Sequence, residues 1–335
     1  MRNAVLLVSI TGSLLLGFAA CGGGEEAGAE DADAGGPSTA PTTGSTSGGE
    51  GASSGAGTSS GTSGGATSSG APEGGASSGT PATPTQGCGA PAAQSGFATG
   101  LSVQVDGATR TYALFVPPTY DVNKPYPLVF AFHGDGGNGA GIRGTMKLEE
   151  QANGAAIFVY PDGVSKTWEL DQPAAKNKDI KLVTALVDKL SATYCTDATR
   201  RFAAGFSRGA YFANQLVCRS PRAFRGVASH GGGGPYGLDG EYDANGNWAC
   251  TAPLPAALVV HGANDDLGDF GAESRDFYRT GNACKTTTKP YAPSPCVAYD
   301  GCAAGKPLVF CKIPSMGHAF WTSGPTVTWS FFASL

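Results

Sequence analysis

Apolar and polar positions alternate where the C-terminal part of the chain begins. Residues 101–105 and 110–116 carry apolar side chains at roughly every second position, with Asp106-Gly107 between the two stretches. Such alternation predicts half-buried strands, and Asp-Gly is a common turn between the strands of a hairpin. We therefore expect an antiparallel hairpin here.

The later apolar stretches are continuous instead of alternating. Residues 127–133 (PLVFAFH) are apolar at nearly every position, as in a central parallel strand that is buried on both faces. Residues 180–190 space leucine and valine as on one face of a helix. Strands are expected at residues 127–133, 155–160, 200–206, 225–229, 256–261 and 307–313, and helices at 180–190, 210–218, 273–280 and 327–335. This alternation predicts an α/β fold, with a mostly parallel, doubly wound sheet and flanking helices in a single domain.

The N-terminal part has a different composition. Residues 1–21 combine Arg2 with an apolar run and end in Phe18-Ala19-Ala20-Cys21. They resemble a bacterial lipoprotein signal peptide, in which cleavage leaves an acylated Cys21 at the new N-terminus; an ordinary secretory signal and an uncleaved anchor are the alternatives. Residues 22–87 contain no aromatic, Ile, Leu, Val, Met, Lys or Arg residue, so we expect a disordered linker with a reach of about 45 Å.

Residues 88–335 are long enough for one domain with a full core. The chain has a net charge of −5, a pI near 5.4 and no basic stripe, so we expect no nucleic-acid partner. Asp239, Glu241 and Asp243 hint at calcium but match no known calcium-loop spacing. We therefore expect no metal and no cofactor, and a monomer.

The cysteines point to an oxidising compartment. Without Cys21, eight of the nine cysteines remain, and none of them forms a C-x-x-C pair. An even number in an exported domain predicts disulfides. We expect Cys195–Cys218, because Cys195 precedes one strand and Cys218 ends the helix that runs back beside it. The other expected pairs are Cys296–Cys302, a local loop link, and Cys284–Cys311 and Cys88–Cys250, which follow by elimination.

Ser207 is the candidate nucleophile. Gly205-Phe206-Ser207-Arg208-Gly209 fits G-x-S-x-G, in which two glycines let a strand and a helix approach and a strained turn exposes the serine oxygen. The pattern also occurs by chance in the Gly/Ser-rich stretch, at residues 51–55 among others. Only Ser207 has an apolar run before it and a helix-competent run after it.

The glycine-rich loop at residues 133–139 has two interpretations. Residues 134–139 fit G-x-G-x-x-G after a strand, and Asp162 ends the next strand, as in a dinucleotide site. However, we expect no helix to begin at the third glycine, and a nicotinamide cofactor is not supplied outside the cell. The preferred interpretation is the H-G-G-type loop of esterases, in which the backbone N–H groups of Asp135 or its neighbour and of Arg208 bind the oxyanion.

A nucleophilic serine needs a base and an acid, which follow it along the chain in the order acid, then histidine. Only His318 follows all the expected strands; His133, His230 and His261 each end one. Asp265 comes just after the strand at residues 256–261 and is the preferred acid. Asp266 is its nearest alternative and Asp269 the third.

Seven segments, in order, resemble carbohydrate esterase family 1, with its feruloyl esterases and polyhydroxybutyrate depolymerase-like esterases. They are HGDGGNG from His133, VYPDG from Val159, Trp168, CTDATRRFAAGFSRGAYFANQLVC from Cys195, HGANDD from His261, PSPCVAYDGC from Pro293 and GHAFW from Gly317. The resemblance covers residues 88–335 and implies an α/β-hydrolase fold, with Ser207 as nucleophile, Asp265 as acid and His318 as base. Two positions depart from it: Phe320-Trp321 stands where relatives often have Trp-Pro, and Gly209-Ala210 where many have two glycines.

The expected function is hydrolysis of carboxylic esters through an acyl-enzyme by an exported, membrane-anchored or secreted enzyme. We expect a feruloyl-type esterase that acts on plant-wall polysaccharides such as xylan and prefers an aromatic acyl group to acetyl. Trp168, Phe320 and Trp321 are the candidate substrate-binding residues, with Trp248 a further aromatic that could line a cleft. The alternatives are a polyester depolymerase, an acetyl xylan esterase and a non-catalytic glycan-binding lipoprotein.

Overall fold

The computed structural model describes residues 81–235 and 249–335. The expected signal peptide with Cys21, the linker up to residue 80, Trp248 and the acidic group at residues 239–243 lie outside the described residues. No helix of the described part is long and apolar enough to span a bilayer.

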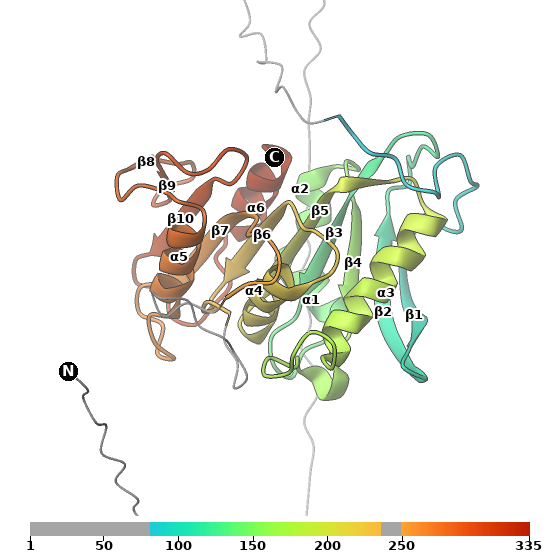
Figure 1. The fold of residues 1–335 in the computed structure, drawn as a ribbon, viewed down its shortest axis with the longest axis horizontal. Coiled ribbons are helices and arrows are strands. Elements are labelled where there is room, and N and C mark those ends of the chain that lie inside the picture. Colours follow the sequence, from blue (N-terminus) through green and yellow to red (C-terminus); the bar gives the residue numbers. More distant parts are fainter. Residues whose placement is uncertain (1–80, 236–248) are drawn as a thin grey trace, which may run out of the picture. The chain divides into compact units, whose positions relative to one another are not determined.

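A ten-stranded sheet forms the centre of the domain (Figure 1). In chain order its strands are β1 Gly96–Val105, β2 Ala108–Val116, β3 Tyr126–Phe132, β4 Ile157–Pro161, β5 Thr196–Phe206, β6 Gly226–His230, β7 Ala256–Gly262, β8 Thr288–Pro290, β9 Val297–Tyr299 and β10 Leu308–Ile313. Their order across the sheet is β1-β2-β4-β3-β5-β6-β7-β10-β9-β8. The six strands from β4 to β10 in this order are parallel, and the two at each edge are antiparallel. The predicted mostly parallel sheet is therefore confirmed.

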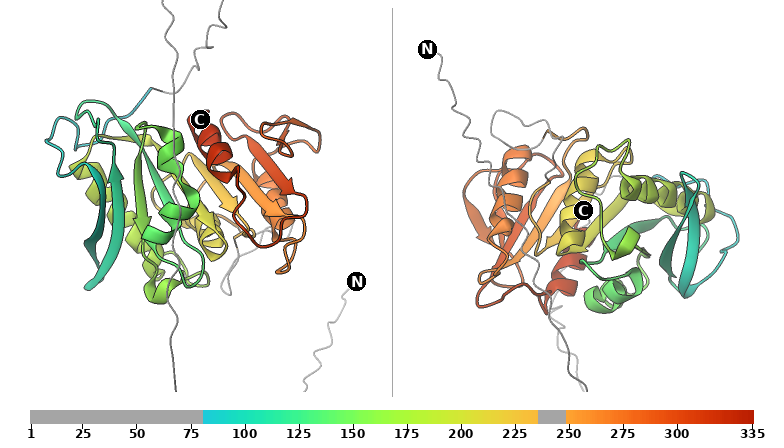
Figure 2. Two further views of the ribbon diagram at one scale, coloured as in Figure 1. Left: turned by 180° about the vertical axis from the view of Figure 1, so that it is seen from behind. Right: turned by 90° about the horizontal axis from the view of Figure 1, so that it is seen from below.

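Helices cover both faces of the sheet (Figure 2). α3 Lys178–Thr193, α4 Arg208–Arg219 and α5 Phe270–Gly281 pack on one face, and α1 Gly139–Met146, α2 Leu148–Ala152 and α6 Gly324–Ala333 on the other. Along β3, Leu128 and Phe130 face the first layer, whereas Val129 and Ala131 face the second. Burial on both faces is the reason why this strand is continuously apolar.

α1 corrects the expectation that no helix begins at the third glycine of the loop. The helix starts at Gly139, and the Asn138 side chain accepts a hydrogen bond from the Gly141 N–H (2.8 Å). The Asp162 carboxylate also accepts from the Gly139 N–H (2.8 Å). A carboxylate therefore occupies the helix start where a dinucleotide would place its phosphates, which disfavours the dinucleotide interpretation.

All eight cysteines among the described residues form disulfides, but the four expected pairings were wrong. The bonds are Cys88–Cys195, Cys218–Cys250, Cys284–Cys302 and Cys296–Cys311. Cys88 reaches Cys195 because the segment before it runs beside the start of β5, where the Thr85 N–H donates to the Thr196 carbonyl (3.0 Å).

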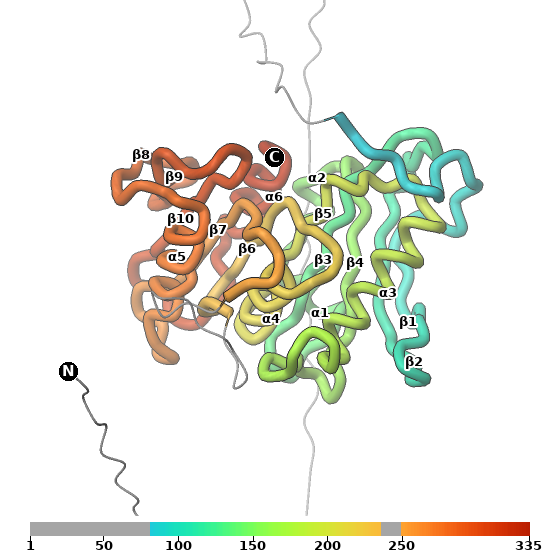
Figure 3. Tube along the Cα trace, in the orientation of Figure 1, coloured from blue at the N-terminus to red at the C-terminus, as the bar shows by residue number. Residues whose placement is uncertain are grey.

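The other pairings follow from local contacts that the sequence did not reveal. The Thr251 N–H donates to the Cys218 carbonyl (3.1 Å), which brings the neighbouring Cys250 to the end of α4. β9 pairs with β10 and thereby places Cys296 beside Cys311. The tube in Figure 3 shows β8 and β9 at the edge of the sheet.

Candidate active site

Ser207 lies on a sharp turn between β5 and α4. Its backbone has φ 54° and ψ −128°, a conformation that strains any residue except glycine. A Cβ atom on Gly205 would lie 2.1 Å from the Gly209 carbonyl oxygen, and one on Gly209 would lie 2.3 Å from that of Phe132. Both glycines are therefore required by the close approach of strand and helix, as the sequence pattern predicts.

Three side chains from distant parts of the chain form a hydrogen-bonded triad. His318 Nε2 lies 2.8 Å from Ser207 Oγ, and His318 Nδ1 lies 2.9 Å from Asp265 Oδ2. The Asp265 side chain is only 2% exposed, and its Oδ1 accepts from the Leu267 N–H (3.0 Å). A buried carboxylate that accepts from Nδ1–H leaves Nε2 unprotonated, so this nitrogen can accept the serine proton.

The neighbouring aspartates are placed differently. The Asp269 carboxylate pairs with Lys312 Nζ at 2.6 Å, which lowers the pKa of Asp269. Asp266 is exposed and makes no side-chain hydrogen bond among the described residues. Of the three candidates, only Asp265 contacts His318.

The His318 imidazole packs against a cluster of aromatic rings. The Phe206 ring stacks on it, with 5.3 Å between the ring centroids. Phe320 in turn packs edge-on against Phe206 (6.0 Å) and contacts the buried His230 ring (4.6 Å). The Phe320 contacts found are thus structural, and substrate binding by Phe320 or by the half-buried Trp321 stays a prediction.

Two other histidines are held neutral by burial. His133 Nε2 accepts from the Gly163 N–H (3.0 Å), so its Nδ1 carries the proton and donates to the Gly134 carbonyl (2.7 Å). Burial lowers the pKa of His133, and it lowers the pKa of His230 to about 3. Neither ring contacts Ser207.

The loop after β3 passes beside the serine. A Cβ atom on Gly134 would lie 3.3 Å from the Ser207 Cβ, so the loop comes into contact with the turn. Among the described residues, the backbone N–H groups of Asp135 and Arg208 have no hydrogen-bond partner. Arg208 is also the first residue of α4, where the helix dipole favours negative charge.

Trp168, a predicted substrate-binding residue, lies in the core of the domain and not in an open cleft. Its side chain is fully buried, stacks on Phe212 with 4.8 Å between centroids, and meets Phe132 edge-on (5.3 Å). Its indole N–H donates to the His133 carbonyl (2.7 Å). Nothing in the sequence indicated that this tryptophan, in a loop after a strand, would point into the core.

Sequence reasoning also missed two residues that contact the site. His261 Nε2 donates to the Gly268 carbonyl (2.9 Å), and the Thr167 hydroxyl donates to the Asp135 carboxylate. The only signal for either was its position: His261 lies near the carboxyl end of β7, and Thr167 lies in the loop after β4. No group of three His, Cys, Asp or Glu side chains in the described residues is arranged to hold a metal ion.

Comparisons with known proteins relate this chain to esterases. An esterase family model, described as "Putative esterase", matches residues 104–260. The chain is 31% identical to "Probable feruloyl esterase C" of Aspergillus niger, over 68% of this chain and 85% of that protein. It is 30% identical to feruloyl esterase C of Emericella nidulans, over 75% of this chain and 93% of that protein. The solved structure of an acetyl xylan esterase from Aspergillus awamori has the same fold, with a TM-score of 0.55 at 16% identity over 71% of this chain and 99% of that one.

Proposed function

The chain belongs to the feruloyl esterase family and is a carboxylic ester hydrolase, and we propose that it hydrolyses feruloyl-type esters through an acyl-enzyme formed on Ser207. The observation that supports this proposal most strongly is the hydrogen-bonded triad of Ser207, His318 and Asp265. The α/β-hydrolase fold predicted from the sequence is confirmed.

In the first half-reaction, Ser207 Oγ attacks the ester carbonyl carbon while His318 Nε2 takes the hydroxyl proton. Asp265 accepts the Nδ1–H hydrogen bond, fixes the tautomer and stabilises the imidazolium. The carbonyl oxygen becomes an oxyanion between the N–H groups of Asp135 and Arg208, where one such donor lowers the barrier by about 3 kcal/mol. His318 then protonates the leaving alcohol, and the ester C–O bond breaks.

In the second half-reaction, water attacks the acyl-enzyme. His318 takes a proton from this water, and the same oxyanion donors hold the new tetrahedral intermediate. When the bond to Ser207 Oγ breaks, His318 returns the proton to the serine and the free acid leaves. The residues named supply every proton transfer in this cycle.

The natural substrate proposed is an ester-bearing plant-wall polysaccharide. The enzyme would act outside the cytoplasm, because four disulfides need an oxidising compartment. We further propose that it acts as a monomer held on the membrane through acylated Cys21 and a linker. The linker expected at residues 22–87 would end before Thr83, because the Thr83 N–H donates to the Asp197 carboxylate (3.0 Å) and holds this part of the chain on the domain. Membrane fractions from cells making the wild type or Cys21→Ser test this part: release of the variant only would support the anchor.

The main test is release of ferulate from methyl ferulate and from feruloylated arabinoxylan, with Ser207→Ala as the inactive control. Acetylated xylan and hydroxybutyrate oligomers, assayed in parallel, cover the acetyl xylan esterase and polyester depolymerase alternatives. Ferulate release by the wild type alone is the expected result. Hydrolysis of only acetylated xylan or only hydroxybutyrate would overturn the proposed acyl group, and hydrolysis of no ester would overturn the enzyme assignment.

A further inference from the structure

The two proposed oxyanion donors come from different parts of the fold. Asp135 lies in the loop after β3, whereas Arg208 begins α4. An oxyanion hole works only when both N–H groups lie about 3 Å from one oxygen, and a shift of about 1 Å can cost a hundredfold in rate. Something must therefore fix the loop relative to the helix.

The side chains of these two residues face each other and share a partner segment, residues 163–168. Arg208 Nε lies 3.6 Å from Asp135 Oδ1, the oxygen that also accepts the Thr167 hydroxyl hydrogen bond. Arg208 Nε also donates to the Trp168 carbonyl oxygen (3.1 Å). The segment thus contacts both donor residues at once.

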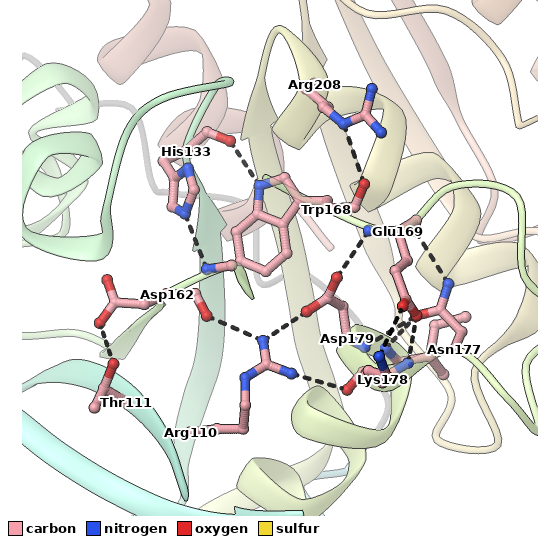
Figure 4. A network of polar contacts seen from close by, with 12 residues as sticks. Arg110, Thr111, His133, Asp162, Trp168, Glu169, Asn177, Lys178, Asp179 and Arg208 are labelled. Atoms are coloured by element: carbon pink, nitrogen blue, oxygen red, sulfur yellow. Dashed lines mark hydrogen bonds and ion pairs between the residues drawn. The ribbon is translucent and has the colours of Figure 1, made fainter. Parts of the chain in front are cut away.

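Trp168 connects the segment to the end of β3 as well. Figure 4 shows its indole N–H pointing to the His133 carbonyl, while its own carbonyl meets Arg208. Two further bonds join the segment to the loop: the Gly136 N–H donates to the Lys166 carbonyl (2.9 Å), and the Gly163 N–H donates to His133 Nε2 (3.0 Å). The loop and the helix are therefore held to one segment rather than only to each other.

The segment itself rests on a buried ion pair. Arg110 Nη2 lies 2.6 Å from Asp179 Oδ1, and both side chains are almost fully buried. Arg110 Nη2 also donates to the Asp162 carbonyl (3.1 Å), just before the segment, and Asp179 Oδ2 accepts from the Glu169 N–H (2.8 Å), just after it. Figure 4 shows these contacts on both sides of Trp168. Both ends of the segment are thus fixed to the protein interior.

The burial of each side chain indicates which of these contacts fix the loop after β3 relative to α4. The Arg208 side chain is 33% exposed and that of Asp135 63%, so their direct attraction is screened by solvent and contributes little. Trp168 is fully buried, and its hydrogen bond to His133 cannot be replaced by water. The half-buried Thr167 adds a short-range hydrogen bond from its hydroxyl to the exposed Asp135 carboxylate.

We propose that Thr167 and Trp168 are positioning residues that set the distance between the oxyanion donors of Asp135 and Arg208. The inference rests on the proposed function, because it requires an oxyanion to be bound there. Neither side chain needs to touch the substrate. Their loss should therefore reduce kcat and leave KM nearly unchanged.

The test compares Thr167→Val, which removes the hydroxyl at equal size, with Thr167→Ser, which keeps it. Thr199→Val is the matched control. The Thr199 hydroxyl also donates to a carboxylate, that of Asp197 (2.7 Å), but it lies near the start of β5, away from Ser207. With p-nitrophenyl acetate, we expect about a tenfold loss of kcat in Thr167→Val and near wild-type kcat in the other two variants. Inhibition by an aryl boronic acid, which mimics the tetrahedral intermediate, should weaken in parallel only in Thr167→Val.

Trp168→Phe provides the second measurement. It keeps an aromatic ring in the core but removes the N–H, so kcat should fall at least as far as in Thr167→Val. If Trp168→Phe does not fold, the threonine series still decides. Equal kcat and boronate affinity in folded Thr167→Val and wild type would overturn the inference, whereas failure of the wild type to hydrolyse any ester would instead overturn the proposed function.

Discussion

His261 Nε2 lies 3.4 Å from Asp265 Oδ2, the oxygen that also receives the hydrogen bond from His318. The His261 side chain is buried, and its Nε2–H is donated to the Gly268 carbonyl at 2.9 Å. The His261 side chain therefore fixes the loop that carries Asp265 to β7. This explains how an exposed loop presents a fixed carboxylate to His318.

Replacing Asp265 by asparagine tests the proposed acid. The amide is nearly isosteric but can donate to Nδ1 and so favours the wrong tautomer, which should lower kcat by roughly 10⁴-fold. Asp266→Asn is the matched control, because this exposed neighbour does not contact His318. Steady-state kinetics with p-nitrophenyl acetate measure both. A comparable loss in the two variants would contradict the assignment.

Ser207→Ala and Ser207→Gly separate catalysis from backbone strain. Both remove the nucleophile, so ester hydrolysis should disappear in both. Glycine adopts the φ of 54° and ψ of −128° without a Cβ clash, so Ser207→Gly should be more stable than Ser207→Ala by roughly 1 kcal/mol. Urea unfolding followed by circular dichroism measures the difference; equal stabilities would show that the turn is not strained.

The sequence predicted the parts of the fold whose residues have a local pattern. β3 and β7 are continuously apolar because both faces are covered. Ser207 lies between two glycines: Gly205 is required by the close approach of β5 to α4, and Gly209 by that of the end of β3 to α4. β8 was missed because it has three exposed residues and includes a proline. α1 was missed because its glycines have low helix propensity, and its start depends on a carboxylate that lies 23 residues further along.

The candidate site also has features that the sequence predicts and features that it does not. Ser207, Asp265 and His318 each follow a strand in the chain order typical of this chemistry, so their convergence could be predicted. The inward orientation of Trp168 depends on its packing against Phe132 and Phe212, which come together only in the assembled fold. The disulfide pairings failed for the same reason, since they depend on which segments become neighbours.

The buried His230 should make the protein less stable in mild acid. In the unfolded chain its pKa is about 6.5, whereas burial lowers the pKa to about 3 in the folded protein. Below pH 6.5 the unfolded state therefore binds the extra proton, and the free energy of unfolding falls as the pH drops towards 3. Between pH 7.5 and pH 5 the loss from this residue alone should be about 2 kcal/mol.

His230→Leu checks this contribution, because leucine cannot titrate. The variant loses the contact of His230 Nε2 with the Thr328 hydroxyl (2.8 Å), so the comparison concerns the change with pH and not the stability at one pH. Urea unfolding at pH 7.5 and pH 5 should give a smaller decrease for the variant. An unchanged decrease would mean that other groups cause it.

The four disulfides should differ in their contribution to stability. Cys88–Cys195 closes a separation of 107 residues, and Cys296–Cys311 one of 15. In the chain-entropy account, losing the first bond costs about 5 kcal/mol and losing the second about 3 kcal/mol. Unfolding of the two double Cys→Ala variants measures this, after non-reducing peptide mapping has verified the pairs. A larger loss from the shorter link would contradict the account.

The preference for an aromatic acyl group now depends on fewer residues than the sequence suggested. With Trp168 buried, Trp321 is the remaining tryptophan near His318 among the described residues, and it is only half-buried. One aromatic contact contributes about 1 kcal/mol, so kcat/KM for methyl ferulate should exceed that for methyl acetate by roughly five- to tenfold. Trp321→Ala should remove most of this preference and affect methyl acetate little if the ring contacts the acyl group. An equal loss on both substrates would instead assign Trp321 to packing behind His318, as found for Phe320.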